Sequence, residues 1–158
     1  MTVQEAAALL QGKDQILILT HRRPDGDTIG CAAGLCAALR RLGKTVYVLE
    51  NPEVTDINRG YVEPYWAPAD FAPDFVVSVD IAARQLFYPA AERYLPRVDL
   101  AIDHHPSQEF FAKETCLEAD RAACGEIIYA ICRELGEITP EIALPLYAAV
   151  ATDTGCFV

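Results

Sequence analysis

Four short runs rich in apolar residues, separated by segments with helical features, constrain the fold of this chain most strongly. These runs are predicted strands over residues 16–20, 45–50, 74–80 and 99–103. Continuous apolar runs of this length are typical of strands that are buried on both faces. Because the strands alternate with helices, they are expected to pair in parallel. The sequence therefore predicts an α/β fold, a doubly wound, mostly parallel sheet with helices on both faces.

The predicted helices cover residues 4–11, 29–42, 124–135 and 139–151. The second of them is rich in small residues, which would let it lie close against a sheet. Thr139 is the expected N-cap of the last helix, and Pro140 is its first helical residue. Residues 82–95 are expected to form a helical connection that Pro89 interrupts. Residues 51–72 show no clear period and are expected to be irregular, with room for a short element.

The charge balance excludes one class of function. The chain has 13 basic and 23 acidic residues, which leave a formal net charge of −10. It therefore lacks the broad basic surface of duplex-binding proteins, and no extended duplex binding is expected. A phosphate-bearing substrate would need a local source of positive charge, and metal ions bound by clustered carboxylates are such a source.

The six cysteines show no C-x-x-C spacing, and most have apolar neighbours. They are expected to be buried thiols in a reducing compartment. No run approaches the roughly 18 consecutive apolar residues of a membrane span, and the first residues lack the features of a signal peptide. We therefore expect a cytoplasmic protein that has no membrane partner.

Polar residues of one chemical kind follow three of the predicted strands and end the last predicted helix. Parallel strands would bring these residues to one edge of the sheet, where strand ends form binding sites in such folds. The group includes all three histidines of the chain. Its members are His21, Asp25, Asp27, Asp80, Asp103, His104, His105 and Asp153.

Carboxylates gathered at one apolar edge repel one another and are costly to keep ionised without cations. Oxygen donors with a few imidazoles and no thiolates favour Mn²⁺ or Mg²⁺ over structural zinc. In two-metal sites the ions lie about 3.5–4 Å apart and activate water for attack on phosphorus. Taken singly, each carboxylate after a strand can also be a helix N-cap. Capping alone does not account for four acidic clusters that hold every histidine, so we predict phosphoester or phosphoanhydride hydrolysis.

Four segments resemble, in order and spacing, the motifs of the DHH phosphoesterase superfamily. They are HRRPDGDTIG (21–30), the Asp80 of VVSVD, IDHH (102–105) and ATDTG (151–155). Within the superfamily the chain looks most similar to the nanoRNase and pAp-phosphatase group. That group removes nucleotides from very short oligoribonucleotides and dephosphorylates 3′-phosphoadenosine 5′-phosphate. The resemblance implies that residues 1–158 form the catalytic DHH domain.

The resemblance also implies a cofactor of two divalent cations, Mn²⁺ ahead of Mg²⁺ or Co²⁺. His21 and Asp25 would hold one ion. The other would be held by Asp27, His104 and Asp153. Asp80 would bridge both ions.

By the same resemblance, His105, Asp80 and Asp103 are the implied catalytic residues. His105 would be free to contact phosphate, and Arg84 is the other candidate substrate contact. Asp103 would accept a ring N–H and so orient a histidine. At a few positions, none of them a proposed ligand, the chain departs from residues that this group often carries: Arg23, Cys31, Gln108 and Cys124.

The implied partners are a short oligonucleotide or nucleotide substrate and, in addition, a second copy in a homodimer. Family members carry a C-terminal substrate-binding (DHHA1-like) domain that nothing here resembles. Because the chain stops five residues after Asp153, we expect a truncated catalytic domain that binds metal but hydrolyses poorly alone. The alternatives are a cyclic dinucleotide phosphodiesterase, a RecJ-type single-strand exonuclease, a pyrophosphatase or polyphosphatase, a non-catalytic metal- and nucleotide-binding regulator, and a plain α/β domain whose acidic edge only caps helices.

Overall fold

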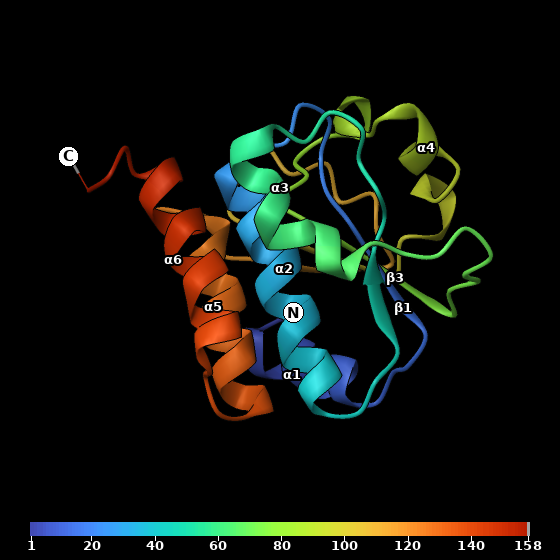
Figure 1. Cartoon of the computed structure of the whole chain (residues 1–158), viewed down its shortest axis with the longest axis horizontal. Helices are drawn as coiled ribbons and strands as arrows, with labels where there is room; N and C mark the ends of the chain where they lie inside the picture. The colour runs from blue at the N-terminus through green and yellow to red at the C-terminus, as the bar shows by residue number, and fades with distance from the viewer. Residues whose placement is uncertain (158) are drawn as a thin grey trace.

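The computed structural model describes residues 1–157, which form a five-stranded sheet covered by helices (Figure 1). The strand order is β2-β1-β3-β4-β5, and every neighbouring pair is parallel. The strands are β1 (Ile16–Leu19), β2 (Val46–Val48), β3 (Phe75–Val79), β4 (Leu100–Asp103) and β5 (Glu114–Leu117). The order reverses between β1 and β3, the kind of switch point at which such sheets form binding sites. The predicted α/β class and parallel pairing are confirmed.

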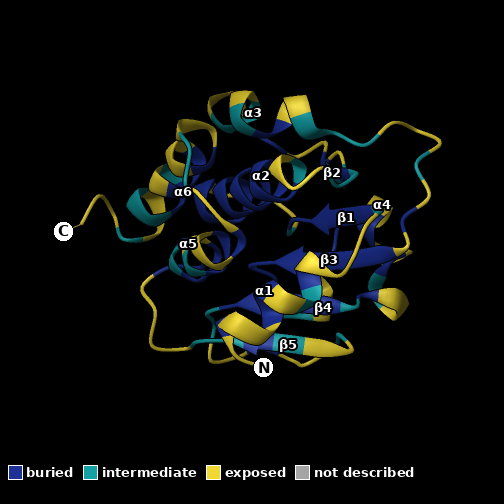
Figure 2. Cartoon of the chain, turned by 90° about the horizontal axis from the view of Figure 1, so that it is seen from below, coloured by how far each residue is buried: buried dark blue, intermediate teal, exposed yellow. Residues whose placement is uncertain are grey.

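One face of the sheet carries the long helices. They are α1 (Val3–Gln11), α2 (Gly26–Arg41), α5 (Cys124–Leu135) and α6 (Pro140–Asp153). Alternate side chains of β1, Ile16 and Ile18, share a buried core with α1, α2 and α5. Helix α6 packs mainly on α2 and α5, and Figure 2 shows it beside them. Within residues 1–157, no helix is long and apolar enough to cross a membrane.

The opposite face is covered by short helical pieces. Leu17 and Leu19 of β1 pack there with Tyr88 and Tyr94, around α4 (Pro89–Glu92). Two 3₁₀ turns, η2 (Arg84–Leu86) and η3 (Leu95–Arg97), flank α4. The helical connection that we predicted over residues 82–95, interrupted at Pro89, is thus present as separate short pieces. Pro89 is the first residue of α4, a position where the N–H that proline lacks would have no partner within the helix.

Other boundaries also differ from the prediction. Helix α2 begins at Gly26, earlier than expected, because the Asp25 carboxylate accepts hydrogen bonds from the N–H groups of Asp27 and Thr28. The segment expected to be irregular contains α3 (Asp56–Val62) and a 3₁₀ turn, η1 (Glu63–Tyr65). Strand β5 was not predicted, because it lies at the sheet edge and buries only Cys116.

The last helix starts as predicted. Thr139 is the N-cap of α6 and Pro140 its first residue, although the Thr139 hydroxyl makes no capping hydrogen bond. The cysteines also follow the prediction in the main, since five are buried free thiols and Cys156 is exposed.

Glycines on α2 face α6 rather than the sheet. A Cβ atom on Gly30 would overlap the Pro145 carbonyl, and one on Gly34 would lie 2.7 Å from Cγ of Leu146. The missing side chains let the two helices cross closely. This crossing brings the C-terminal end of α6, with Asp153, to the N-terminal end of α2, with Asp27.

Candidate metal centre

The predicted ligands meet at the carboxyl edge of the sheet. His21 follows β1, Asp80 follows β3, and His104 follows β4, while α2 and α6 contribute the remaining carboxylates. Among the described residues, ligand atoms come together in three groups, which are His21 with Asp25 and Asp80; Asp27 with His104 and Asp153; and Asp80 with His104 and His105. All six residues predicted to hold metal therefore lie in one cluster.

The first group surrounds the Nε2 atom of His21. This atom lies 3.5 Å from Oδ1 of Asp25 and 3.7 Å from Oδ2 of Asp80. The other ring nitrogen, Nδ1, lies 2.8 Å from the carbonyl oxygen of Arg22. Because a carbonyl oxygen can only accept, Nδ1 carries the hydrogen, which leaves the Nε2 lone pair directed at the carboxylates in the neutral ring. Metal-binding histidines are commonly oriented in this way.

Asp25 contacts both the N-terminus of α2 and His21. Its Oδ1 atom caps α2 and also faces His21. Asp25 is therefore a helix N-cap, as the sequence allowed, and it is still placed to act as a metal ligand. Although burial acts to raise it, hydrogen bonding to His21 lowers the pKa of Asp25. For His21 the directions are opposite: burial acts to lower the pKa, but the hydrogen bonds with Asp25 and the Arg22 carbonyl raise it. The neighbouring Asp25 carboxylate thus favours the protonated form of His21 in the metal-free protein.

The second group surrounds Nε2 of His104. This atom lies 3.5 Å from Oδ2 of Asp153, 3.6 Å from Oδ1 of Asp80 and 3.9 Å from Oδ2 of Asp27. As in His21, Nδ1 is turned away from the cluster and lies 3.1 Å from a carbonyl oxygen, that of Arg121. Both histidines are thus held by backbone carbonyls with the same ring edge toward the carboxylates.

Asp27 is fully buried against the N-terminus of α5. Its carboxylate accepts hydrogen bonds from the N–H groups of Cys124 at 2.8 Å and Gly125 at 2.9 Å, and from the Cys31 thiol at 3.3 Å. Ala123, the N-cap of α5, makes no side-chain capping bond, so Asp27 satisfies these helix N–H groups from a distant part of the chain. Burial nevertheless raises the pKa of Asp27.

Asp80 lies between the two groups. It is buried and its φ angle is 59°, a left-handed conformation that is uncommon for a residue other than glycine. Burial, together with the negative charges of Asp27 and Asp25, raises the pKa of Asp80 well above its usual value. The ionised carboxylate is thus costly in the protein without a cation.

Two buried atoms in the cluster have no hydrogen-bond partner among the described residues, namely Oδ1 of Asp80 and Nε2 of His104. They lie 3.6 Å apart and belong to neighbouring strand ends. An unsatisfied buried polar atom costs about 1–3 kcal/mol, so such atoms are uncommon unless a ligand completes them. Carboxylate and imidazole donors in this arrangement fit divalent cations.

His105 and Asp103 form a separate pair beside the cluster. Nδ1 of His105 lies 2.8 Å from Oδ1 of Asp103, which also accepts hydrogen bonds from the N–H groups of His104 and His105. Hydrogen bonding to Asp103 raises the pKa of His105, which favours the positively charged imidazolium. The His105 side chain is 43% exposed, against 14% for His21 and 12% for His104. It is therefore the histidine that remains accessible to a ligand.

Arg84 does not join the cluster. Its guanidinium group lies 3.0 Å from Oε2 of Glu109 in an exposed ion pair. The structure thus places it near the end of β3, as the sequence suggests, but outside the three groups of candidate ligands.

Several supporting contacts were not predicted. The carbonyls of Arg22 and Arg121 and the N–H groups of Cys124 and Gly125 act through the backbone, so their residue types carry no signal. Gln108 is different, because its buried side chain donates to Asp103, and its only signal was a departure from the residue common in similar sequences.

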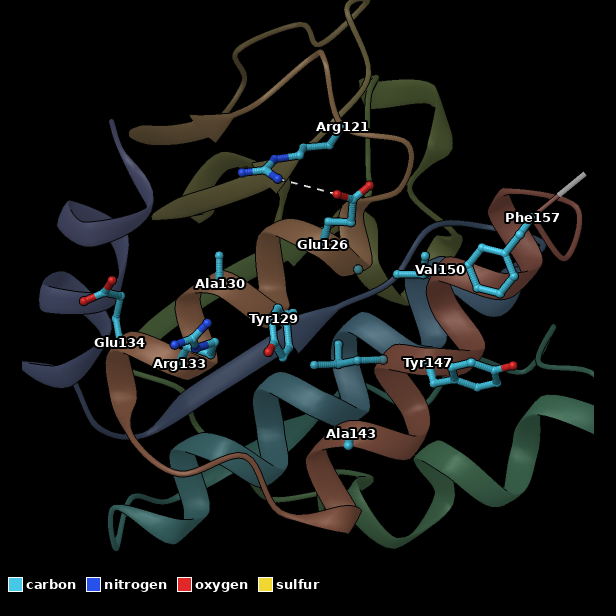
Figure 3. A pocket seen from close by; sticks show the side chains of 12 residues that line it. Arg121, Glu126, Tyr129, Ala130, Arg133, Glu134, Ala143, Tyr147, Val150 and Phe157 are labelled. Atoms are coloured by element: carbon cyan, nitrogen blue, oxygen red, sulfur yellow. Dashed lines mark hydrogen bonds and ion pairs between the residues drawn. The ribbon is translucent and has the colours of Figure 1, made fainter.

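A groove of about 750 Å³ runs along α5 and α6 next to the candidate metal centre (Figure 3). Tyr129, Tyr147 and Phe157 line it together with charged side chains of both signs, including the ion-paired Arg121 and Glu126. Because the backbone carbonyl of Arg121 also contacts the ring of His104, one end of the groove borders the candidate ligands.

Comparison with known sequences identifies one matching family model. The model described as "DHH family, N-terminal domain" matches residues 15–150. Among curated relatives, the bifunctional oligoribonuclease and PAP phosphatase NrnA of Thermus thermophilus is 33% identical over 147 residues, covering 90% of this chain and 44% of the relative. The protein with the same description from Bacillus subtilis is 25% identical over 154 residues, covering 91% and 47%. The chain spans about half the length of these relatives.

Two solved structures share the fold. An exopolyphosphatase-related protein from Bacteroides fragilis superposes with a TM-score of 0.80 at 22% identity, covering 99% of this chain and 51% of that protein. The exonuclease RecJ bound to manganese gives a TM-score of 0.57 at 21% identity, covering 100% and 43%. The fold is therefore shared with larger proteins.

Proposed function

The chain belongs to the DHH family, and from this premise we propose that it is the metal-binding domain of a phosphoesterase that acts on short oligoribonucleotides, 3′-phosphoadenosine 5′-phosphate, or both. One observation carries the proposal. Six carboxylate and imidazole side chains converge on a common centre in which Oδ1 of Asp80 and Nε2 of His104 lack partners.

We propose that two divalent cations occupy this centre. His21, Asp25 and Asp80 would hold one, and the other would be held by Asp27, His104 and Asp153, with Asp80 shared. Such cations activate a water molecule and neutralise charge that develops at phosphorus. Mn²⁺ is the proposed metal, ahead of Mg²⁺ or Co²⁺, because the donors combine hard oxygens with imidazole nitrogens.

In this proposal His105 contacts the phosphate oxygens. Its exposure, its place 3.5 Å from Oδ1 of Asp80 and its hydrogen bond to Asp103 support this role. A positively charged donor aimed at the developing charge favours the transition state over the ground state. Asp103 would orient the ring and keep its charge. Arg84 would reach substrate only by leaving its ion pair with Glu109.

The proposed substrate class is supported by the relatives, whose printed names are oligoribonuclease and PAP phosphatase. The net charge of −10 supports a small substrate, because a long polyanion would be repelled outside the centre. We further propose that the protein works in the reducing cytoplasm. Five buried free thiols and no disulfide among the described residues are compatible with that setting.

The first test uses bis(p-nitrophenyl) phosphate, a diester without a base, to measure chemistry at the centre apart from nucleotide selection. The chain is stripped of metal and supplied with Mn²⁺, Mg²⁺ or no metal. We expect slow hydrolysis that requires the divalent ion and is lost in Asp80→Ala and His104→Ala. Asp56→Ala, which removes a fully exposed carboxylate on α3, should keep it. Undiminished hydrolysis in Asp80→Ala and His104→Ala would overturn the assignment.

A substrate panel then separates the alternatives. 3′-Phosphoadenosine 5′-phosphate, a diribonucleotide, cyclic di-AMP, single-stranded DNA and pyrophosphate are each supplied with the preferred metal. We expect the first two to be hydrolysed fastest. Calorimetric binding of metal and nucleotide without turnover of any compound would instead identify a non-catalytic regulator.

A further inference from the structure

Gln108 is a buried residue in the loop between β4 and β5, and both polar atoms of its side-chain amide are hydrogen-bonded within the protein. Its Nε2 atom donates to the carbonyl oxygen of Ile81 at 2.9 Å and to Oδ2 of Asp103 at 2.7 Å. Its Oε1 atom accepts from the N–H of Phe110 at 3.1 Å. Only 5% of the residue is exposed, so these bonds have no competition from solvent.

The partners of this amide belong to two separate loops of the metal centre. Ile81 directly follows Asp80, the residue shared by both ligand groups, whose φ angle is 59°. A left-handed residue persists only where its surroundings hold it, and the bond to the Ile81 carbonyl is one such restraint. Gln108 therefore holds the loop after β3 at the residue next to Asp80.

The other partner, Asp103, organises the loop after β4. Oδ1 of Asp103 accepts the N–H groups of His104 and His105 and faces Nδ1 of His105, while Oδ2 is taken by Gln108. With both oxygens engaged, the carboxylate has one orientation. That orientation sets the direction of the His105 ring and the start of the segment that carries His104.

An amide of this length is suited to the task because it combines two N–H donors with one acceptor. Glutamate at this position would offer no donor to Ile81 or Asp103 and would add a second negative charge. Leucine would fill the space and make none of the bonds. Asparagine would keep the donors on a stem that is shorter by one methylene group.

We propose that Gln108 is a positioning residue of the metal centre, which joins the loops after β3 and β4 and thereby sets the relative placement of Asp80 and the His104–His105 pair. It touches neither ion nor substrate in this role. The proposal rests on the proposed function of the cluster as a divalent metal centre.

The test compares Gln108→Leu, Gln108→Asn and wild type in the full 158-residue chain. Calorimetry gives the Kd for Mn²⁺, and hydrolysis of bis(p-nitrophenyl) phosphate at saturating Mn²⁺ gives kcat and KM. We expect Gln108→Leu to raise the Kd and to lower kcat by about 10–100-fold with little change in KM, because small misplacements of reacting groups have effects of this order. Gln108→Asn should fall between Gln108→Leu and wild type.

The control is Leu10→Ala, which opens the core at α1, far along the chain from the centre. It should lower Tm at least as much as Gln108→Leu and leave the Kd and kcat unchanged at 25 °C. A wild-type Kd and kcat in Gln108→Leu would overturn the proposal. Equal losses in Leu10→Ala would overturn it too, since they would reflect general destabilisation.

Nitrogen NMR of the imidazoles in the metal-free chain is independent of ion and substrate. The Nδ1 signal of His105 should shift in Gln108→Leu or Gln108→Asn, whereas the signals of His21, held by the Arg22 carbonyl, should stay. If Gln108→Leu does not fold, the same comparisons are made with Gln108→Asn, and wild-type values there would refute the role. If wild type binds no Mn²⁺ or lacks turnover, the proposed function fails, while the His105 signal still decides whether Gln108 positions the pair.

Discussion

Replacing Asp80 with asparagine should stabilise the metal-free protein while removing its response to metal. The Asp80 carboxylate is buried, its Oδ1 atom has no hydrogen-bond partner among the described residues, and Asp25 and Asp27 lie nearby. Burial and these charges raise the pKa of Asp80, so the folded state is penalised wherever the carboxylate is ionised. A neutral amide of the same shape removes that penalty.

The magnitude follows from the unpaired atom and from the size of the domain. An unsatisfied buried group costs about 1–3 kcal/mol, and more when it is charged. For a chain of this length, each kcal/mol shifts Tm by about 2–4 °C. Differential scanning calorimetry without metal at pH 8 should therefore show Asp80→Asn melting roughly 2–12 °C above wild type. The gain should shrink as the pH falls through the raised pKa of Asp80, because wild type then neutralises this group by protonation.

Added Mn²⁺ should raise the Tm of wild type much more than that of Asp80→Asn. Free Mn²⁺ at about 100 times its Kd stabilises the wild type by about 2.7 kcal/mol, or roughly 5–11 °C in Tm. Asp80→Asn should show almost none of this increase, since the ligand shared by the two groups is lost. A metal-free Asp80→Asn that melts below wild type, or one that keeps the full Mn²⁺ increase, would refute the reasoning.

Asp103→Asn is the matched control. Asp103 is also a buried carboxylate at the same edge, but its two oxygens accept hydrogen bonds from the backbone of His104 and His105 and from Gln108. An amide nitrogen in place of one oxygen would face a donor. We therefore expect this variant to melt about 2–12 °C below wild type in the absence of metal, the opposite sign to Asp80→Asn.

Three further outcomes are expected. His105→Ala should keep the Kd for Mn²⁺ and lower kcat about 10²–10³-fold in the diester assay, the usual loss for one donor to developing charge; an unchanged kcat would exclude the phosphate contact. Calorimetry at pH 6 and pH 8 should show weaker Mn²⁺ binding at the lower pH, because the raised pKa values of Asp80 and His21 make protons compete with cations; affinity independent of pH would contradict this. Gly30→Ala should lower both Tm and Mn²⁺ affinity by pushing α6 away, whereas Gly60→Ala, which meets open space, should lower neither.

Most of the strands that were predicted correctly have an apolar sequence that matches their complete burial in the folded chain. Strands β1, β3 and β4 are buried along their whole length, so their apolar runs are visible in sequence. Strand β5 carries one buried residue, Cys116, and its pairing with β4 is what makes it a strand. The start of α2 was predicted too late because Asp25 acts as the N-cap only when its carboxylate accepts hydrogen bonds from Asp27 and Thr28, and the local sequence pattern does not show that contact.

The candidate ligands were predictable because metal chemistry depends on residue type, and the carboxylates and histidines stand at strand and helix ends in the sequence. The sequence by itself determined the parallel sheet, the candidate donors and the edge at which these side chains gather. Only the tertiary structure decided which ring nitrogen of His21 and His104 faces the centre, because that choice is made by the carbonyls of Arg22 and Arg121. Only the tertiary structure, likewise, placed Asp27 on the N–H groups of α5. Backbone groups are the same in every residue, so their contacts leave no trace in sequence until the chain is folded.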